Sequence, residues 1–475
     1  MRALRSVAIG MSAMALLVGP TMQGARSATV PVNTNVSEMP GNNAEDAIAA
    51  NPTNPGNVVA MTTLPDADSG LFKGVSFDGG STWDRSTIGG SADDPLGPIC
   101  CDQQMTFDRF GNLWVVYLRN DDPGAFVALS TDGGRSFAHL FDIAPRFPSR
   151  GGSSNGGSRR ERAKKNLFAD QPSIAVGPNS VWVSYTVSPS AVIQAAGMSV
   201  TGLGVFGSFS APQNVPTGQG HGDYGDTAVG PDGQVMVVYQ NKTGGQQGAT
   251  IFTARDPDGL GPRGFDDPKE FAETEVGGFD YIPAQPDRSV DAEANLAWDK
   301  TGGPHNGRLY AIWTQESPNE SDNTDVMFQH SDDNGATWTP PVKLNDDATA
   351  NSQFNPAIAL DPATGAVGVA WYDAREDLGA GGPGDTDGVP NDDSEFWATY
   401  STDGGATLVP NFKVSAGASN AADVGNNFDY GDYTHAAFQS GVFYPLWSDN
   451  SNSTGDNPDG ALTALDLSIA RVIVS

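Results

Sequence analysis

The feature that most constrains this 475-residue sequence is a pair of short apolar strands that recurs seven times. In each copy a polar, often acidic step precedes the first strand, and a Gly- or Pro-containing turn leads to a second apolar strand. The copies lie about 54 to 79 residues apart, a spacing that fits four short strands with their loops. The apolar residues that mark the first strands are Ile48, Met105, Ile174, Ala228, Leu296, Ile358 and Ala437.

Seven such units predict an all-β fold, a seven-bladed β-propeller of four-stranded antiparallel blades that occupies residues 28–475 as a single domain. The last unit shows only three strands and ends in LDLSIARVIVS. We expect the segment from Val30 to Val36 to supply its missing outer strand and to close the ring. A six-bladed ring, in which one unit is misread, is the alternative.

Four units repeat a polar turn between the expected third and fourth strands. It reads SFDGGSTW from Ser76, and close copies begin at Ser130, Ser331 and Ser401. In a hairpin the Asp can accept backbone N–H bonds, the Gly can adopt a positive φ, and the aromatic residue can pack between strands. We interpret the turn as structural, which places function on the opposite face, where first strands begin and second strands end.

These turns resemble the Asp-box, or BNR repeat, of the sialidase superfamily, and the resemblance covers most of the mature chain. It implies a β-propeller whose Asp-boxes lie far from the active site. Catalytic members use three arginines to hold a carboxylate, a Tyr activated by a Glu as nucleophile, and an Asp as acid/base. Their Phe-Arg-Ile-Pro motif is not matched before the first turn, and the nearest sequence, at 146–148, follows the second turn.

The N-terminal residues predict export. They combine a basic start, an apolar run of about fourteen residues and small residues that suit cleavage near Ser27. We interpret residues 1–27 as a signal peptide, with a buried N-terminal helix as the alternative. The run is too short to span a membrane, so we expect a secreted protein without membrane insertion.

The charge balance points to the class of partner. The chain has 26 Lys and Arg against 57 Asp and Glu, a net charge of −31, which disfavours nucleic acid and anionic membranes. We expect a monomer that binds a glycan or another small molecule. Two acidic loops, starting at Asp385 and Asp449, could hold Ca²⁺, the one cofactor we consider, although neither has a complete EF-hand pattern. The metal candidates are Asp385, Asp387 and Asp392, with metal-free exposed loops as the alternative.

The expected functional face collects acidic residues at the entrances of the first strands. Carboxylates that converge on one axis must raise their pKa, recruit a cation or find hydrogen-bond donors. The alternative is that each of them caps backbone amides of a neighbouring blade. The entrance residues are Asp102, Asp170, Asp223, Asp291 and either Asp429 or Asp432. The second strands end near Arg119, Asn120, Gln240, Glu316, Asp373, Arg375 and Asp449.

Cys100 and Cys101, the only cysteines, are adjacent at the entrance of the second unit. Because exported thiols tend to oxidise, we predict a disulfide between them that forms an apolar plate for a ligand beside Asp102. Two reduced buried thiols are the alternative. A basic Gly- and Ser-rich insert follows at residues 145–166, and it is either a lid that attracts an anionic glycan or a solvated linker.

Two classes of function remain open. The first is a glycosidase of the exo-sialidase type or a polysaccharide lyase, and the second is a non-catalytic propeller that binds carbohydrate or protein. In an exo-sialidase the resemblance implies an arginine grip, a Tyr nucleophile with a Glu partner, and an acid. The candidates are Arg119, Arg288 and Arg375 for the grip, Tyr433 or Tyr430 for the nucleophile, Glu293 or Glu316 for its partner, and Asp102 for the acid. Salt-bridged structural roles are the alternative for the arginines.

Overall fold

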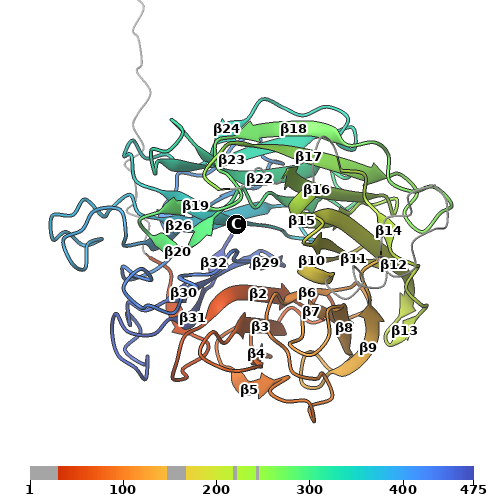
Figure 1. Ribbon diagram of the computed structural model, residues 1–475, viewed down its shortest axis with the longest axis horizontal. Coiled ribbons are helices and arrows are strands. Elements are labelled where there is room, and N and C mark those ends of the chain that lie inside the picture. Colours follow the sequence, from red (N-terminus) through yellow and green to blue (C-terminus); the bar gives the residue numbers. More distant parts are fainter. Residues whose placement is uncertain (1–29, 147–166, 218–221, 242–244, 475) are drawn as a thin grey trace, which may run out of the picture.

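The structure, a computed structural model, describes residues 30–146, 167–217, 222–241 and 245–474. Seven antiparallel blades surround a central axis (Figure 1), so the predicted seven-bladed propeller is confirmed and the six-bladed alternative is wrong. The described residues contain no helix, and therefore none that could cross a membrane. The expected signal peptide and nearly all of the basic insert lie outside the described residues.

In blades 1 to 6 the strands follow the chain from the axis outward. Blades 1 and 2 contain β2 (Ala44–Ala50), β3 (Val58–Thr63), β4 (Leu71–Ser76) and β5 (Asp84–Ile88), then β6 (Gln104–Phe107), β7 (Leu113–Tyr117), β8 (Ala125–Ser130) and β9 (Ala138–Ile143). Blades 3 and 4 contain β10 (Phe168–Val176), β11 (Ser180–Ser188), β12 (Val192–Gly202), β13 (Val205–Phe206) and β14 (Gln213–Asn214), then β15 (Gly222–Val229), β16 (Val235–Asn241), β17 (Ala249–Asp256) and β18 (Lys269–Thr274).

A short hairpin separates blades 4 and 5, and it consists of β19 (Asp280–Ile282) and β20 (Gln285–Val290). Blades 5 and 6 contain β21 (Asn295–Trp298), β22 (Leu309–Glu316), β23 (Thr324–Ser331) and β24 (Val342–Lys343), then β25 (Gln353–Leu360), β26 (Val367–Asp373), β27 (Glu395–Ser401) and β28 (Phe412–Lys413). Blade 7 contains β29 (Ala436–Gln439), β30 (Val442–Asp449), β31 (Asp466–Ala470), β32 (Val472–Ile473) and β1 (Asn33–Asn35).

The N-terminal strand β1 closes the ring, as predicted. It pairs antiparallel with β31, so that Asn33 lies opposite Ala470. The Asn35 Nδ2 atom donates a hydrogen bond of 2.6 Å to Asp466. The next residue, Val36, is fully buried in an apolar cluster shared by blades 1 and 7. The two ends of the described chain thus form one blade together.

The four polar turns share one set of hydrogen bonds. In the first, Asp78 accepts bonds from the backbone N–H and the hydroxyl of Thr82 at 2.9 and 2.7 Å, and Ser76 Oγ accepts the N–H of Gly80. A Cβ placed on Gly404 of the fourth turn would lie 2.5 Å from His305 in the β21–β22 turn. These hairpins therefore lie on the face where first strands end. The equivalent carboxylates are Asp132, Asp333 and Asp403.

The apolar core lies between the blades. The second strand of a blade carries large side chains that are fully buried against its neighbour, as Trp371 of β26 is against Tyr310 and Ile312 of β22. This packing fixes how far each inner strand stands from the axis. The first strands β2, β6, β10, β15 and β29 surround the centre in Figure 1. The starts of the inner strands are thereby arranged in a circle on the face opposite the polar turns.

Candidate functional site

Five of the seven inner strands begin with a polar residue in the left-handed backbone conformation. Each lies three positions before the apolar residue that marks its strand, and the strand ladders of blades 1, 3 and 6 shift register at this point. Such bulges re-aim side chains, and non-glycine residues adopt this conformation only at a cost of about 1 kcal/mol or more. The five residues are Glu45, Asp102, Gln171, Glu293 and Asn355.

Around the axis these strand starts form a group that we call the axial cluster. Its one basic side chain, Arg288, comes from β20 and is ion-paired with Asp432 and, at 3.4 Å, with Glu45. Asp429 accepts the backbone N–H of Arg288 at 2.8 Å and so holds the arginine in place. The axial cluster comprises Glu45, Asp102, Asp170, Asp223, Arg288, Asp291, Glu293, Asp432 and Tyr433.

The carboxyl groups of the axial cluster are crowded and poorly hydrated. Burial raises the pKa of Glu45 to about 7, and the charge of Arg288 only partly opposes this. The pKa of Asp102 lies well above its usual range because of burial first and then because of Glu45 and Asp170. Burial likewise raises the pKa of Glu293 well above the usual range. These groups therefore hold a proton more tightly than ordinary carboxyl groups do, which is the property that an acid catalyst needs.

Several polar atoms in this region have no hydrogen-bond partner among the described residues. The Tyr433 side chain is 6 % exposed, and its hydroxyl is unpaired beside four carboxyl groups that, after burial, raise its pKa well above the usual range. Arg288 Nε, Gln171 Oε1 and Asn355 Oδ1 are also buried and unpaired. Buried polar groups are usually satisfied, so these atoms are available to bond polar groups of a ligand or water.

A cavity of about 600 Å³ opens beside the axial cluster. One part of its wall is apolar and consists of Leu118, Phe168, Phe428 and the Cys100–Cys101 disulfide. The predicted vicinal disulfide is confirmed, because the two cysteines are joined and neither is free. The polar part of the wall includes Glu45, Asp102, Asp170 and Arg288. An apolar plate that faces carboxylates suits a sugar ring, which has apolar faces and hydroxyl edges.

The three arginines expected to grip a carboxylate do not meet. Arg119 lines the cavity together with Arg288, but its Nε and Nη2 groups donate to the carboxylate of Asp121 at 2.8 and 2.7 Å. Arg375 does not line this cavity; it is paired with Asp373 and stacked over the ring of Trp397. The structure therefore brings two of the three guanidinium groups to one cavity, and each of these two already has an acidic partner.

Glu316 and Tyr430 lie away from the cavity wall. The Glu316 carboxylate accepts backbone N–H groups of Glu320, Ser321 and Asp322 at 2.6 to 3.0 Å, so it stabilises its own loop. Tyr430 is 1 % exposed and donates its hydroxyl hydrogen to Ser419 O at 2.7 Å. Glu293, the other expected partner of a tyrosine, does lie close enough to Tyr433 to raise its pKa.

Sequence reasoning missed Glu45, Gln171 and Asn355 as members of this site. The signal that could have found them is their constant position, three residues before the apolar residue of each inner strand. The metal candidates Asp385, Asp387 and Asp392 lie elsewhere, in the loop between β26 and β27. Within the described residues, acidic groups packed closely enough to hold one ion are found in that loop.

No protein-family model matches the chain, and no curated protein matches it. Several solved structures are similar to it at low identity. The polysaccharide lyase Uly1 shares 8 % identity at a TM-score of 0.48, over 94 % of this chain and 100 % of the lyase. The phage phi92 endosialidase shares 10 % identity at a TM-score of 0.46, over 94 % of this chain and 69 % of the endosialidase. The Hadza microbial sialidase Hz136 shares 14 % identity at a TM-score of 0.45, over 88 % of this chain and 76 % of the sialidase.

Proposed function

We propose that the protein binds a neutral glycan in the cavity beside the axial cluster and hydrolyses a glycosidic bond there. One observation carries this proposal: a carboxyl group of raised pKa, Asp102, lies close to a carboxylate paired with arginine, Asp432. Hydrolysis of glycosides uses such a pair, one member to protonate the leaving oxygen and the other to assist attack on the sugar.

In this mechanism Asp102 gives its proton to the glycosidic oxygen while the bond from that oxygen to the anomeric carbon breaks. Asp432 accepts the proton of the attacking water, or attacks the carbon itself before water releases the sugar. Arg288 is ion-paired with Asp432 and holds it in place, and the unpaired Tyr433 hydroxyl can bond a sugar hydroxyl. The disulfide plate and Phe168 supply apolar contact for the ring face.

The substrate we propose is neutral because of the charges around the cavity. The axial cluster contains seven carboxyl groups against one arginine. A sialic acid carboxylate would need a free guanidinium, yet Arg119 is already occupied by Asp121 and Arg375 by Asp373. An acidic sugar would have to displace these carboxylate partners next to further carboxyl groups of like charge. This disfavours acidic sugars, including those that a sialidase or a polysaccharide lyase would use.

The test uses the mature protein on a panel of neutral fluorogenic glycosides, with a sialoside in parallel. Turnover of a neutral substrate should fall by about 100-fold or more in Asp102→Asn, as expected for loss of an acid catalyst. Asp267→Asn, a change at an exposed aspartate, should leave turnover unchanged. Turnover that survives in Asp102→Asn, or cleavage of the sialoside alone, would contradict the assignment.

The second candidate is a propeller that binds glycans without cleaving them, and one observation favours it. Glu45, at the centre of the cluster, has no exposed surface, so part of the charge serves the scaffold. Binding on a glycan array with no release of sugar would support this candidate over the enzyme. Export is part of either proposal, and a mature N-terminus near Ser27 in material recovered outside producing cells would support it.

A further inference from the structure

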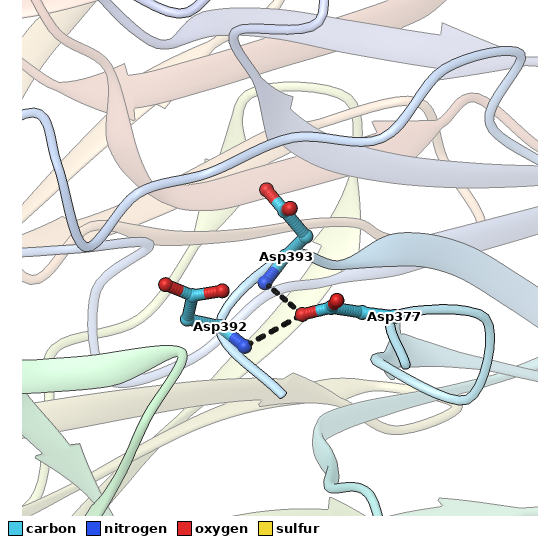
Figure 2. Close-up of side chains that lie close together, drawn as sticks. All are labelled: Asp377, Asp392 and Asp393. Atoms are coloured by element: carbon cyan, nitrogen blue, oxygen red, sulfur yellow. Dashed lines mark hydrogen bonds between the residues drawn. The ribbon is translucent and has the colours of Figure 1, made fainter. Parts of the chain in front are cut away.

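The loop between β26 and β27 contains five aspartates, and three of them come together in its buried part (Figure 2). Asp377, Asp392 and Asp393 each offer a carboxylate oxygen, and these three oxygens lie within 4.8 Å of one another. We call these residues the loop triad. A second group, formed by Asp385, Asp387 and the shared Asp393, is more exposed.

The backbone of the loop holds the loop triad together. Asp377 Oδ2 accepts the N–H groups of both Asp392 and Asp393, at 2.9 and 3.0 Å, as the dashed lines in Figure 2 show. Asp393 accepts the backbone N–H and the hydroxyl of Thr386 at 2.5 and 2.7 Å. These bonds bring three carboxylates close to one another although like charges repel.

Asp392 is the member that these contacts leave unsatisfied. It is 7 % exposed, and its Oδ1 atom has no hydrogen-bond partner among the described residues. The nearby basic residue Lys413 is occupied, since it is paired with Glu376 at 2.7 Å and with Glu395 at 3.0 Å. A buried carboxylate oxygen with neither donor nor counter-ion, beside two further carboxylates, lacks a positively charged partner.

We propose that the loop triad binds a calcium ion through Asp377, Asp392 and Asp393. The three ligands are carboxylate oxygens, and neither histidine nor cysteine takes part, which suits a hard cation. Calcium also accepts irregular geometry, so carbonyl groups and water can complete its shell of six to eight oxygens. Magnesium would demand a stricter octahedron.

Binding here would also stiffen one wall of the cavity. Ser394, the residue after the loop triad, exchanges two backbone hydrogen bonds with Ser419, at 2.8 and 2.9 Å. The segment that begins at Ser419 contains Phe428, which lines the cavity, and Asp429, which holds the backbone of Arg288. The ion site nevertheless stands on its own contacts and does not depend on the proposed catalysis.

The test compares thermal melts and calorimetric titrations of the mature protein with CaCl₂, MgCl₂ and a chelator. Calcium should raise the melting midpoint above that in chelator, because binding to the native state stabilises it. Asp392→Asn should weaken calcium binding by about tenfold or more, since it removes a charged ligand. In chelator this variant should melt at or above the midpoint of the unchanged protein, because one repelling charge is gone.

Asp385→Asn is the matched control from the same loop. The Asp385 carboxylate already accepts backbone N–H groups of Gly381, Asp387 and Gly388, and it is outside the loop triad. Its calcium response should remain. Superimposable melts in calcium and chelator would overturn the site. A response lost in Asp385→Asn but kept in Asp392→Asn would overturn the ligand set.

Discussion

The buried carboxyl of Asp46 gives a quantitative test of the charge arrangement at the ring seam. Asp46 lies in β2 at 1 % exposure, and Ser448 Oγ of β30 contacts both of its carboxylate oxygens at 3.1 and 3.0 Å. Burial raises its pKa from 3.8 to about 7, against the opposing hydrogen bonds of Thr62 and Ser448. The folded protein therefore holds this proton more tightly than the unfolded chain does.

The magnitude follows from that difference. A rise of about 3 pKa units at about 1.36 kcal/mol each sets an upper limit of about 4 kcal/mol. Because the folded-state pKa is the higher one, this part of the stability is fully present below pH 3.8 and is lost as pH rises to about 7. Asp46→Asn keeps the shape of the side chain but cannot ionise, so it should avoid the loss.

The assay is urea unfolding of both proteins at intervals from pH 4 to pH 8. The free energy of unfolding of Asp46→Asn, minus that of the unchanged protein, should increase with pH by up to about 4 kcal/mol and level off above pH 7. Asp267→Asn, at an exposed position, should give a difference that does not vary with pH. A constant difference for Asp46→Asn would refute the reasoning.

Two further predictions concern the ring seam and the cavity wall. Val36→Ala should lower the free energy of unfolding by about 2 kcal/mol, because Val36 is fully buried. Val32→Ala, at a site that is 85 % exposed, should change it little. Equal free energies of unfolding for the two variants would contradict a closing role for β1. Cys100 and Cys101 should resist alkylation until a reductant is added, and the unreduced protein should have a mass two hydrogens below that of its dithiol form. Full labelling of both cysteines without reductant would contradict the disulfide.

The fold could be predicted from the sequence because each blade repeats the same local requirement. An inner strand, a turn and a buried second strand recur with different residues, so the pattern is visible without knowledge of the contacts. The place of β1 was predictable for a related reason. The last unit lacks a strand, and an unpaired strand edge in a closed ring needs a partner from elsewhere in the chain.

The site was only partly predictable. Asp102 and Asp170 were found because strand starts must lie on one face, whatever their side chains do. Glu45 was missed because it has a left-handed backbone conformation at a bulge. The direction of its side chain therefore departs from the regular alternation of a strand, on which the prediction depended. Arg375 and Glu316 were placed at the right strand ends, yet periodicity does not tell which local partner a long side chain will take.

The closure of blade 7 also sets a condition on when the site can exist. Its outer strand is the first segment of the described chain and its neighbour β31 is nearly the last, while Asp432 and Tyr433 immediately precede this blade. A chain that ends before β31 leaves β1 without a partner and the axial carboxylates without a closed ring around them. The axial cluster and the completeness of the chain are thereby linked, so we expect a truncated product to lose the whole cavity instead of keeping a weakened one.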